Sequence, residues 1–169
     1  MKERVVPSTF RNGFYAGLIA ALFLGLWLTQ LWSAEKQVHL HSEHLLRKIE
    51  KRNWSAARDF VAPDYHDEWG DDRALLLRRL RLVLRFFSSL TIKAATPLVQ
   101  LEPPFGVWRA RVELAGKDAG AEVTPEIIRR VNGLTTPFEL RWHHESWKPW
   151  DWKLVEVRNP ELDVPAGFD

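Results

Sequence analysis

The residues best suited to proton-transfer chemistry in this sequence are Asp64, Tyr65 and His144. Histidine titrates near neutral pH, and a nearby carboxylate can orient its ring. His144 is the only titratable residue on the apolar face of its expected strand, and Asp64 and Tyr65 follow a helix that should end at Pro63. The same residues can serve as a turn cap, a core ring and a hydrogen-bonding partner. We favour this structural interpretation over catalysis because the sequence supplies no geometry.

Tryptophan provides a second group of candidate binding residues, because the chain has nine. The candidates for lining a ligand pocket are Tyr65, Trp69, Trp108, Trp142 and His144. Trp147 and Trp150 flank a predicted turn, where we expect exposure, and tryptophan is enriched at interface hot spots. A stacking platform for a sugar ring is another possible use. The simplest use is hairpin and core packing through cross-strand aromatic pairs.

Metal, thiolate and nucleic-acid chemistry are not expected. The chain has no cysteine, which excludes disulfides, thiolate ligands and cysteine nucleophiles. Of His39, His41 and His44, only the last two would be neighbours on a helix, which is a poor zinc site. The net charge of +2 comes from the first 34 residues, since acids and bases balance beyond them. A neutral domain lacks the cations that displace counterions from nucleic acid. We therefore expect no metal, no cofactor and no nucleic-acid partner.

An uncharged apolar run from residue 13 to 32 is expected to organise the chain. As a helix it would be about 30 Å long, the thickness of a bilayer's hydrocarbon core. Basic residues precede it, so the positive-inside rule places residues 1–12 in the cytoplasm and the rest outside, in a periplasm. A cleaved signal peptide is the alternative, but the run exceeds an h-region and Trp32 occupies the minus-three position. We expect a single-pass protein whose partner at 13–32 is the lipid bilayer.

The rest of the chain changes from helical to strand periodicity near residue 89. Helices are expected over 38–51, 54–61 and 71–87, and strands over 90–101, 107–114, 138–147 and 151–158. Pro97 predicts an edge position or a bulge. Residues 124–133 have a Thr-Pro-Glu helix start, although a hairpin turning at Asn132-Gly133 is the alternative.

These patterns predict an α+β domain over 40–160, between a linker at 33–39 and an extended tail at 161–169. Three helices should cover one face of a curved antiparallel sheet.

Residues 45–54, then Phe60-Val61-Ala62-Pro63-Asp64-Tyr65, and a late hairpin around 146–152 carry a resemblance to a known family. This order of elements resembles the nuclear transport factor 2-like (NTF2-like) superfamily, also called the SnoaL-like or cystatin-like cone. The resemblance implies a cone whose mouth can hold a small apolar ligand. Its members include isomerases, dehydratases and hydrolases as well as non-catalytic binding and assembly proteins. The enzymes use an Asp, His or Tyr that projects into the cone.

The expected architecture is also similar to the VirB8-like assembly factors of type IV secretion systems. Arg158-Asn159-Pro160 resembles an Asn-Pro turn that those proteins carry after a late strand.

Our leading hypothesis from sequence is a non-enzymatic, membrane-tethered module that acts through a protein partner or as a homodimer. The interface candidates are Arg141, His143, Glu145, Trp147 and Trp150. The alternatives are a small-ligand-binding or SnoaL-type pocket enzyme and an envelope carbohydrate binder. A hollow cone with an ionisable side chain at its base would favour the pocket protein, and a filled cone would favour the assembly module.

Overall fold

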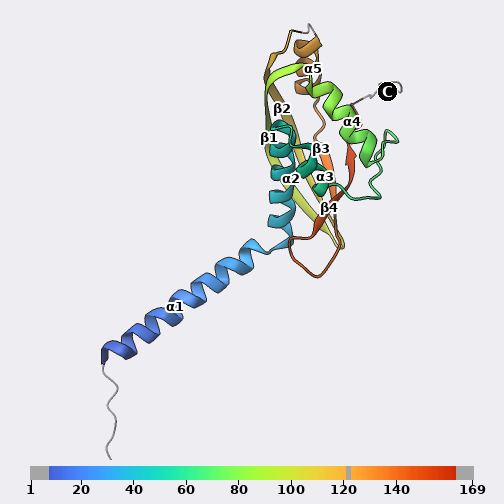
Figure 1. Cartoon of the computed structure of the whole chain (residues 1–169). Helices are drawn as coiled ribbons and strands as arrows, with labels where there is room; N and C mark the ends of the chain where they lie inside the picture. The colour runs from blue at the N-terminus through green and yellow to red at the C-terminus, as the bar shows by residue number, and fades with distance from the viewer. Residues whose placement is uncertain (1–7, 121–122, 163–169) are drawn as a thin grey trace, which may run out of the picture.

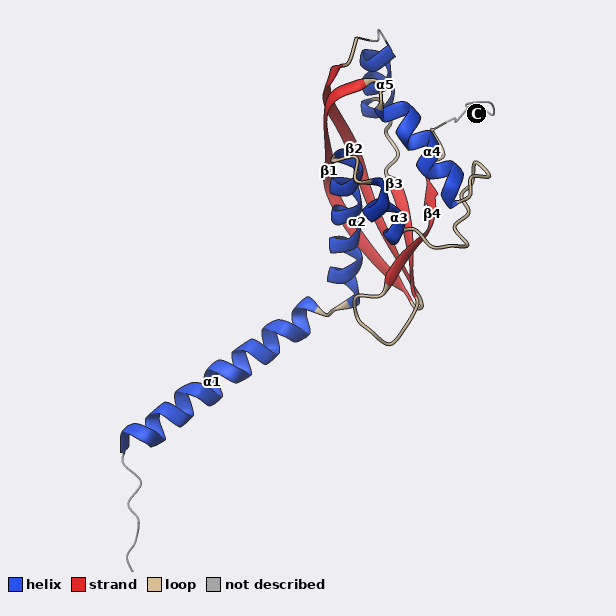
Figure 2. Ribbon diagram, in the orientation of Figure 1, coloured by secondary structure: helices blue, strands red, loops and turns tan. Residues whose placement is uncertain are grey.

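The computed structural model describes residues 8–120 and 123–162, which form five helices and one four-stranded sheet (Figures 1 and 2). The helices are α1 (Ser8–Leu31), α2 (Ala34–Glu50), α3 (Trp54–Phe60), α4 (Arg73–Leu84) and α5 (Val123–Asn132). The strands are β1 (Phe87–Glu102), β2 (Phe105–Asp118), β3 (Phe138–His144) and β4 (Trp152–Arg158). The expected α+β class is confirmed.

The sheet is antiparallel throughout, in the order β1-β2-β3-β4. Its two long strands, β1 and β2, form a hairpin, and Pro97 lies in β1 at the edge of the sheet. The β1–β2 register shifts between Ala95 and Leu98, and Thr96 adopts a φ of 48°. The predicted edge position and the predicted bulge therefore both occur, because proline cannot donate a ladder hydrogen bond.

The helices match the expected elements with shifted boundaries. The helix expected at 71–87 begins at Arg73, because the Asp72 carboxylate accepts a hydrogen bond from Leu75 N at 2.8 Å. It ends at Leu84 because Phe87 already pairs with Asp118 in the sheet. The segment from 64 to 70 is a loop.

Residues 123–132 form a helix, α5, so the hairpin alternative is wrong. The Asn132 side chain docks this helix on β2: its Oδ1 accepts from Leu114 N at 2.7 Å, and its Nδ2 donates to Leu114 O at 2.9 Å. The residue that was the candidate turn is thus used as a paired contact between helix and sheet.

Helix α1 extends away from the domain (Figure 1). Its placed large apolar side chains are exposed, with Phe14 at 63% and Phe23 at 71%. None of the helices, over the residues described, is both long enough and apolar enough to cross a membrane. Residues 34–39 belong to α2, so only residues 32 and 33 separate α1 from the domain. The expected tails at 1–7 and 163–169 lie outside the described residues.

The core lies between the sheet and the helices α2 and α3. The inward face of β2 is Trp108, Ala110, Val112 and Leu114, as the alternation predicts. Trp108 and Trp142 are fully buried. The Trp142 ring meets the rings of His41 and Phe60 edge-on, at centroid distances of 5.8 and 6.4 Å. Large rings thus fill the end of the sheet that α2 and α3 cover.

Replacing Trp142 with alanine is expected to lower the free energy of unfolding by about 3–5 kcal/mol, because the lost ring leaves a cavity. Trp147 is 86% exposed and provides a matched control. The Trp147→Ala variant should stay within about 0.5 kcal/mol of the original chain. Urea unfolding of both variants, followed by far-UV circular dichroism, measures the difference. Equal losses would contradict the core position of Trp142.

Candidate ligand-binding site

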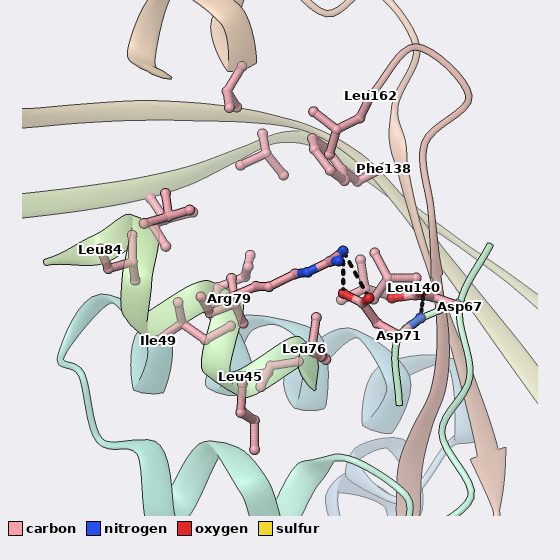
Figure 3. Close-up of a pocket in the computed structure, with 18 of the residues that line it drawn as sticks. Leu45, Ile49, Asp67, Asp71, Leu76, Arg79, Leu84, Phe138, Leu140 and Leu162 are labelled. Carbon is pink, nitrogen blue, oxygen red and sulfur yellow. Dashed lines mark hydrogen bonds and ion pairs between the residues drawn. The ribbon is translucent and has the colours of Figure 1, made fainter. Parts of the chain in front are cut away.

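A cavity of about 410 Å³ lies between α4 and the helix-covered face of the sheet (Figure 3). Leucine, isoleucine and valine side chains from α2, α4, α5 and all four strands line it, together with Phe138 and Trp69. The lining surface is almost entirely carbon. The domain is therefore hollow at this end.

The cavity exists because α4 does not pack fully onto the sheet. Leu76, Leu80 and Val83 fall on one face of α4, line the cavity and are only half-buried. Across the cavity, Ile92 and Val112 of the sheet are also half-buried. Close-packed interiors bury such side chains completely. These two apolar surfaces face each other with space for a molecule between them.

An ion pair stands in the wall of this apolar space. The Arg79 Nη1 lies 2.9 Å from Asp71 Oδ1 and donates a hydrogen bond to Oδ2 at 3.1 Å (Figure 3). The two side chains are 15% and 5% exposed. Burial raises the pKa of the Asp71 carboxyl, and the nearby Asp67 raises it further, while Arg79 lowers it. Arg79 therefore opposes the effect of burial on the pKa of this carboxyl.

A second carboxylate, Asp67, fixes the loop before α4. Its Oδ1 accepts hydrogen bonds from Asp71 N at 2.8 Å and from Trp69 N at 3.1 Å. Its Oδ2 accepts from the Tyr65 hydroxyl at 2.9 Å. Burial, followed by the charge of Asp67, raises the pKa of Tyr65, so the hydroxyl stays protonated as the donor. This network fixes the loop from which α4 starts.

The segment after β4 closes one side of the cavity. Asn159 is fully buried, and its Oδ1 accepts from Glu161 N at 3.0 Å and Leu162 N at 3.1 Å. The Trp69 Nε1 donates to Leu162 O at 2.9 Å. Leu162 and Trp69 both line the cavity. The Asn-Pro turn after β4 thus holds part of the cavity wall in place.

The other candidate residues from the sequence do not lie together in one site. Asp64 is exposed in a turn, and Tyr65 is buried behind the cavity wall as the donor to Asp67. The His144 ring stacks on Trp152 at 4.7 Å, and its Nε2 lies 2.7 Å from Lys148 O. His144 therefore packs against the β3–β4 turn rather than beside Asp64. Of the tryptophans proposed for a pocket, Trp69 lines the cavity, whereas Trp108 and Trp142 fill the core.

Asp67, Asp71 and Arg79 are not among the site residues that the sequence predicts. Asp71 was interpreted only as a helix start. Arg79 is three residues after Leu76, which places it on the apolar side of α4. A charged residue on that side was the signal that could have identified it.

The residues proposed as an interface lie on the opposite face of the sheet or beyond its end. The Arg141 guanidinium stands 4.1 Å from the centre of the Phe105 ring, and the His143 ring lies 5.1 Å from the same ring. Glu145 is exposed in the loop after β3, together with Trp147 and Trp150. A homodimer through these residues remains a prediction.

No protein-family model matches the sequence, and no curated protein matches it. Solved structures share its fold. An NTF2-like superfamily protein from Salmonella enterica aligns with a TM-score of 0.57 at 13% identity, covering 81% of this chain and 97% of that chain. An NTF2-like protein of unknown function from Pseudomonas putida aligns with a TM-score of 0.53 at 8% identity, covering 74% of this chain and 84% of that chain.

Bd1075 from Bdellovibrio bacteriovorus aligns with a TM-score of 0.54 at 5% identity over 73% of this chain, which spans only 38% of Bd1075. At these identities the similarity shows the fold alone. The chain therefore has an NTF2-like fold, as its order of elements predicted.

Replacing Arg79 with methionine is expected to lower the free energy of unfolding at neutral pH by about 3–5 kcal/mol, because it leaves a buried carboxylate unpaired. The pKa of Asp71 is already raised in the folded protein, and losing Arg79 raises it further. A raised pKa means that the folded state favours the protonated carboxyl. The Arg79→Met variant should therefore lose least stability in acid, where Asp71 is protonated. The loss should grow as the pH rises through the raised pKa of Asp71.

The control is the double variant Arg79→Met with Asp71→Asn, which removes the buried charge and should recover most of the lost stability. Chemical unfolding at a series of pH values compares the two variants. A loss in Arg79→Met that does not change with pH would contradict a charged Asp71 beside the cavity.

Proposed function

We propose that this chain binds a small, uncharged apolar molecule in the cavity beneath α4. The observation that supports this proposal is a space of about 410 Å³ with an almost entirely carbon lining. Ligand sites in proteins usually occupy about 300–1,000 Å³ and are mostly apolar. A dry apolar cavity of about 150 Å³ already binds benzene. The cavity here suits a fused-ring hydrocarbon skeleton or a medium-length acyl chain.

The geometry favours binding over catalysis. A general acid or base must reach its substrate at hydrogen-bond distance. Among the described residues of the cavity wall, Tyr65 and backbone N–H groups donate hydrogen bonds to Asp67, and Arg79 forms the ion pair with Asp71, whose Oδ1 accepts no hydrogen bond. Their hydrogen bonds position the loop and α4. The ligand then meets carbon surface and gains affinity through burial.

The hollow interior also changes the order of the hypotheses drawn from the sequence. From the sequence alone, a filled cone would favour the assembly module. A cavity with an ionisable pair in its wall is instead the feature that we associated with a ligand-binding protein. A carbohydrate binder needs exposed rings for stacking. Trp142 and Trp152 are buried, so only Trp147 and Trp150 of the hairpin tryptophans are exposed.

We also propose that residues 13–32 attach the domain to a bilayer as a single-pass anchor, with residues 1–12 cytoplasmic and the domain periplasmic. Three features support this. The run is uncharged, the basic residues precede it, and α1 projects away from the domain with Phe14, Phe23 and Leu26 exposed (Figure 1). Apolar surface of this extent needs a cover. A single anchor followed by a cone-shaped domain is also the architecture of VirB8-like factors, so a related assembly role stays a hypothesis.

The ligand proposal predicts that full-length protein binds the uncharged fluorescent probe N-phenyl-1-naphthylamine. Ile92→Trp replaces an aliphatic side chain with a larger indole ring in the cavity. It should weaken binding at least about tenfold, equivalent to about 1.4 kcal/mol. Leu98→Trp is the matched control, since Leu98 lies on the same strand and is 70% exposed. Fluorescence titration measures affinity, and circular dichroism checks folding. A probe that binds the original chain and Ile92→Trp equally would exclude this cavity as the site.

The anchor proposal predicts that alkaline carbonate leaves the full chain in the membrane fraction. The double change Leu18→Arg and Leu22→Arg should release it, because each arginine at the centre of a span costs about 2.5–3.5 kcal/mol. Leu98→Arg changes the same residue type on the domain surface and should not release the chain. Release of the unaltered protein would refute the anchor.

A further inference from the structure

The β3–β4 loop, residues 145–151, carries two exposed tryptophans on an ordered turn. Trp147 is 86% exposed and Trp150 is 54% exposed. The other tryptophans of the hairpin differ sharply, since Trp142 is fully buried and Trp152 is 5% exposed. A tryptophan side chain has a large apolar surface, and its burial is favourable. Two such rings beside each other in the chain indicate a surface that something else covers.

The loop is held firmly enough to present these rings. Asp151 N donates to Lys148 O at 3.0 Å, and Glu145 N donates to Asp151 O at 2.9 Å. The Trp152 Nε1 donates to Pro149 O at 2.9 Å. These hydrogen bonds are made by the backbone and by the buried Trp152. The Trp147 and Trp150 rings stay exposed.

The loop lies at the end of the domain from which α1 departs (Figures 1 and 2). The backbone of Trp150 lies beside His41 of α2. Only residues 32 and 33 join α1 to α2, which limits the separation of the two helix ends to about 11 Å. Trp32, in that junction, is 49% exposed. Three exposed indoles therefore gather at one end of the domain, next to the apolar helix.

We infer that the 145–151 loop inserts Trp147 and Trp150 into the headgroup layer of the bilayer that α1 enters. This inference rests on the proposed anchor at 13–32. Tryptophan favours the boundary between hydrocarbon and water, where its ring is covered and its N–H stays hydrated. The charged residues in the loop and directly after it are Glu145, Lys148, Asp151 and Lys153, which balance in formal charge. The contact therefore depends on the rings and needs no anionic lipid.

The contact gives the domain a second attachment to the membrane besides α1. Without it, only residues 32 and 33 would join the domain to α1. A second contact at the loop fixes one orientation. The α5 end of the sheet then faces away from the bilayer (Figure 1).

The test uses the absence of cysteine in the chain, which makes any introduced cysteine a unique label site. Lys148→Cys places a nitrobenzoxadiazole (NBD) label between the two tryptophans and keeps both. Ala119→Cys places the same label in the exposed turn after β2, at the far end of the domain (Figure 1). Full-length protein is reconstituted into phosphatidylcholine vesicles whose headgroups carry a spin-label quencher.

We expect the emission of the label at position 148 to fall at least by half, and the emission at position 119 to stay unchanged. Adding Trp147→Ser and Trp150→Ser to the Lys148→Cys chain should restore most of the emission, while circular dichroism stays the same. Trp147→Phe should keep the quenching.

Each other outcome contradicts the inference in a distinguishable way. Protein that floats with the vesicles but shows no quenching at position 148 refutes the loop contact and leaves the anchor intact. A label that is shielded from water without being quenched indicates a second protein copy on the loop, and also refutes lipid contact. Protein that does not float with the vesicles refutes the anchor and the loop contact together.

Discussion

The buried ion pair between Asp71 and Arg79 is the constraint on which the cavity depends. Two charges removed from water cost several kcal/mol each, and only close geometry with further hydrogen bonds offsets that cost. Here Asp71 lies just before α4 and Arg79 lies within it, so the pair joins the helix to the loop from which it starts. Asp67 in turn binds the backbone of that loop. The helix is positioned at its beginning by charge, and Leu76 and Leu80 stay half-buried, whereas Leu77 and Leu84 are buried in the core.

Side-chain size decides which end of the domain is hollow. Trp108 and Trp142 fill the space under α2 and α3, where they are fully buried. Farther along the sheet the inward residues are smaller, such as Ile92, Val112 and Leu114, and they line the cavity. The helix over this region is the one held by the ion pair. Smaller residues under a helix that stands off the sheet leave an apolar space. Such a space is unfavourable for water and favourable for an apolar molecule.

The two proposals assign different work to the two ends of the domain. The end next to α1 carries exposed tryptophans on a hydrogen-bonded turn. The end beneath α4 holds the apolar space. Helix α2 is common to both, since it follows α1 and its Leu45, Leu46 and Ile49 line the cavity. Helix α2 therefore connects the end of the domain next to α1 with the end that holds the cavity.

Patterns in the sequence were enough to predict the order of elements, the alternating face of β2, the bulge at Pro97 and the α+β class. These follow from interactions between near neighbours in the chain, so periodicity and turn residues reveal them. The sequence also predicted the NTF2-like fold through that order. It did not identify most of the residues that line and frame the cavity. Arg79 and Asp71 have meaning only as a pair, and Trp69 meets Leu162 across 93 positions.

Whether the interior is hollow or filled was likewise decided only by tertiary structure. Cavity volume is the difference between the space that the backbone encloses and the volume of the side chains within it. The sequence lists the side chains, but the enclosed space depends on how far α4 stands from the sheet. That distance is set by contacts between residues far apart in the chain, such as those of Asp67, Arg79 and Leu162, which no local pattern records.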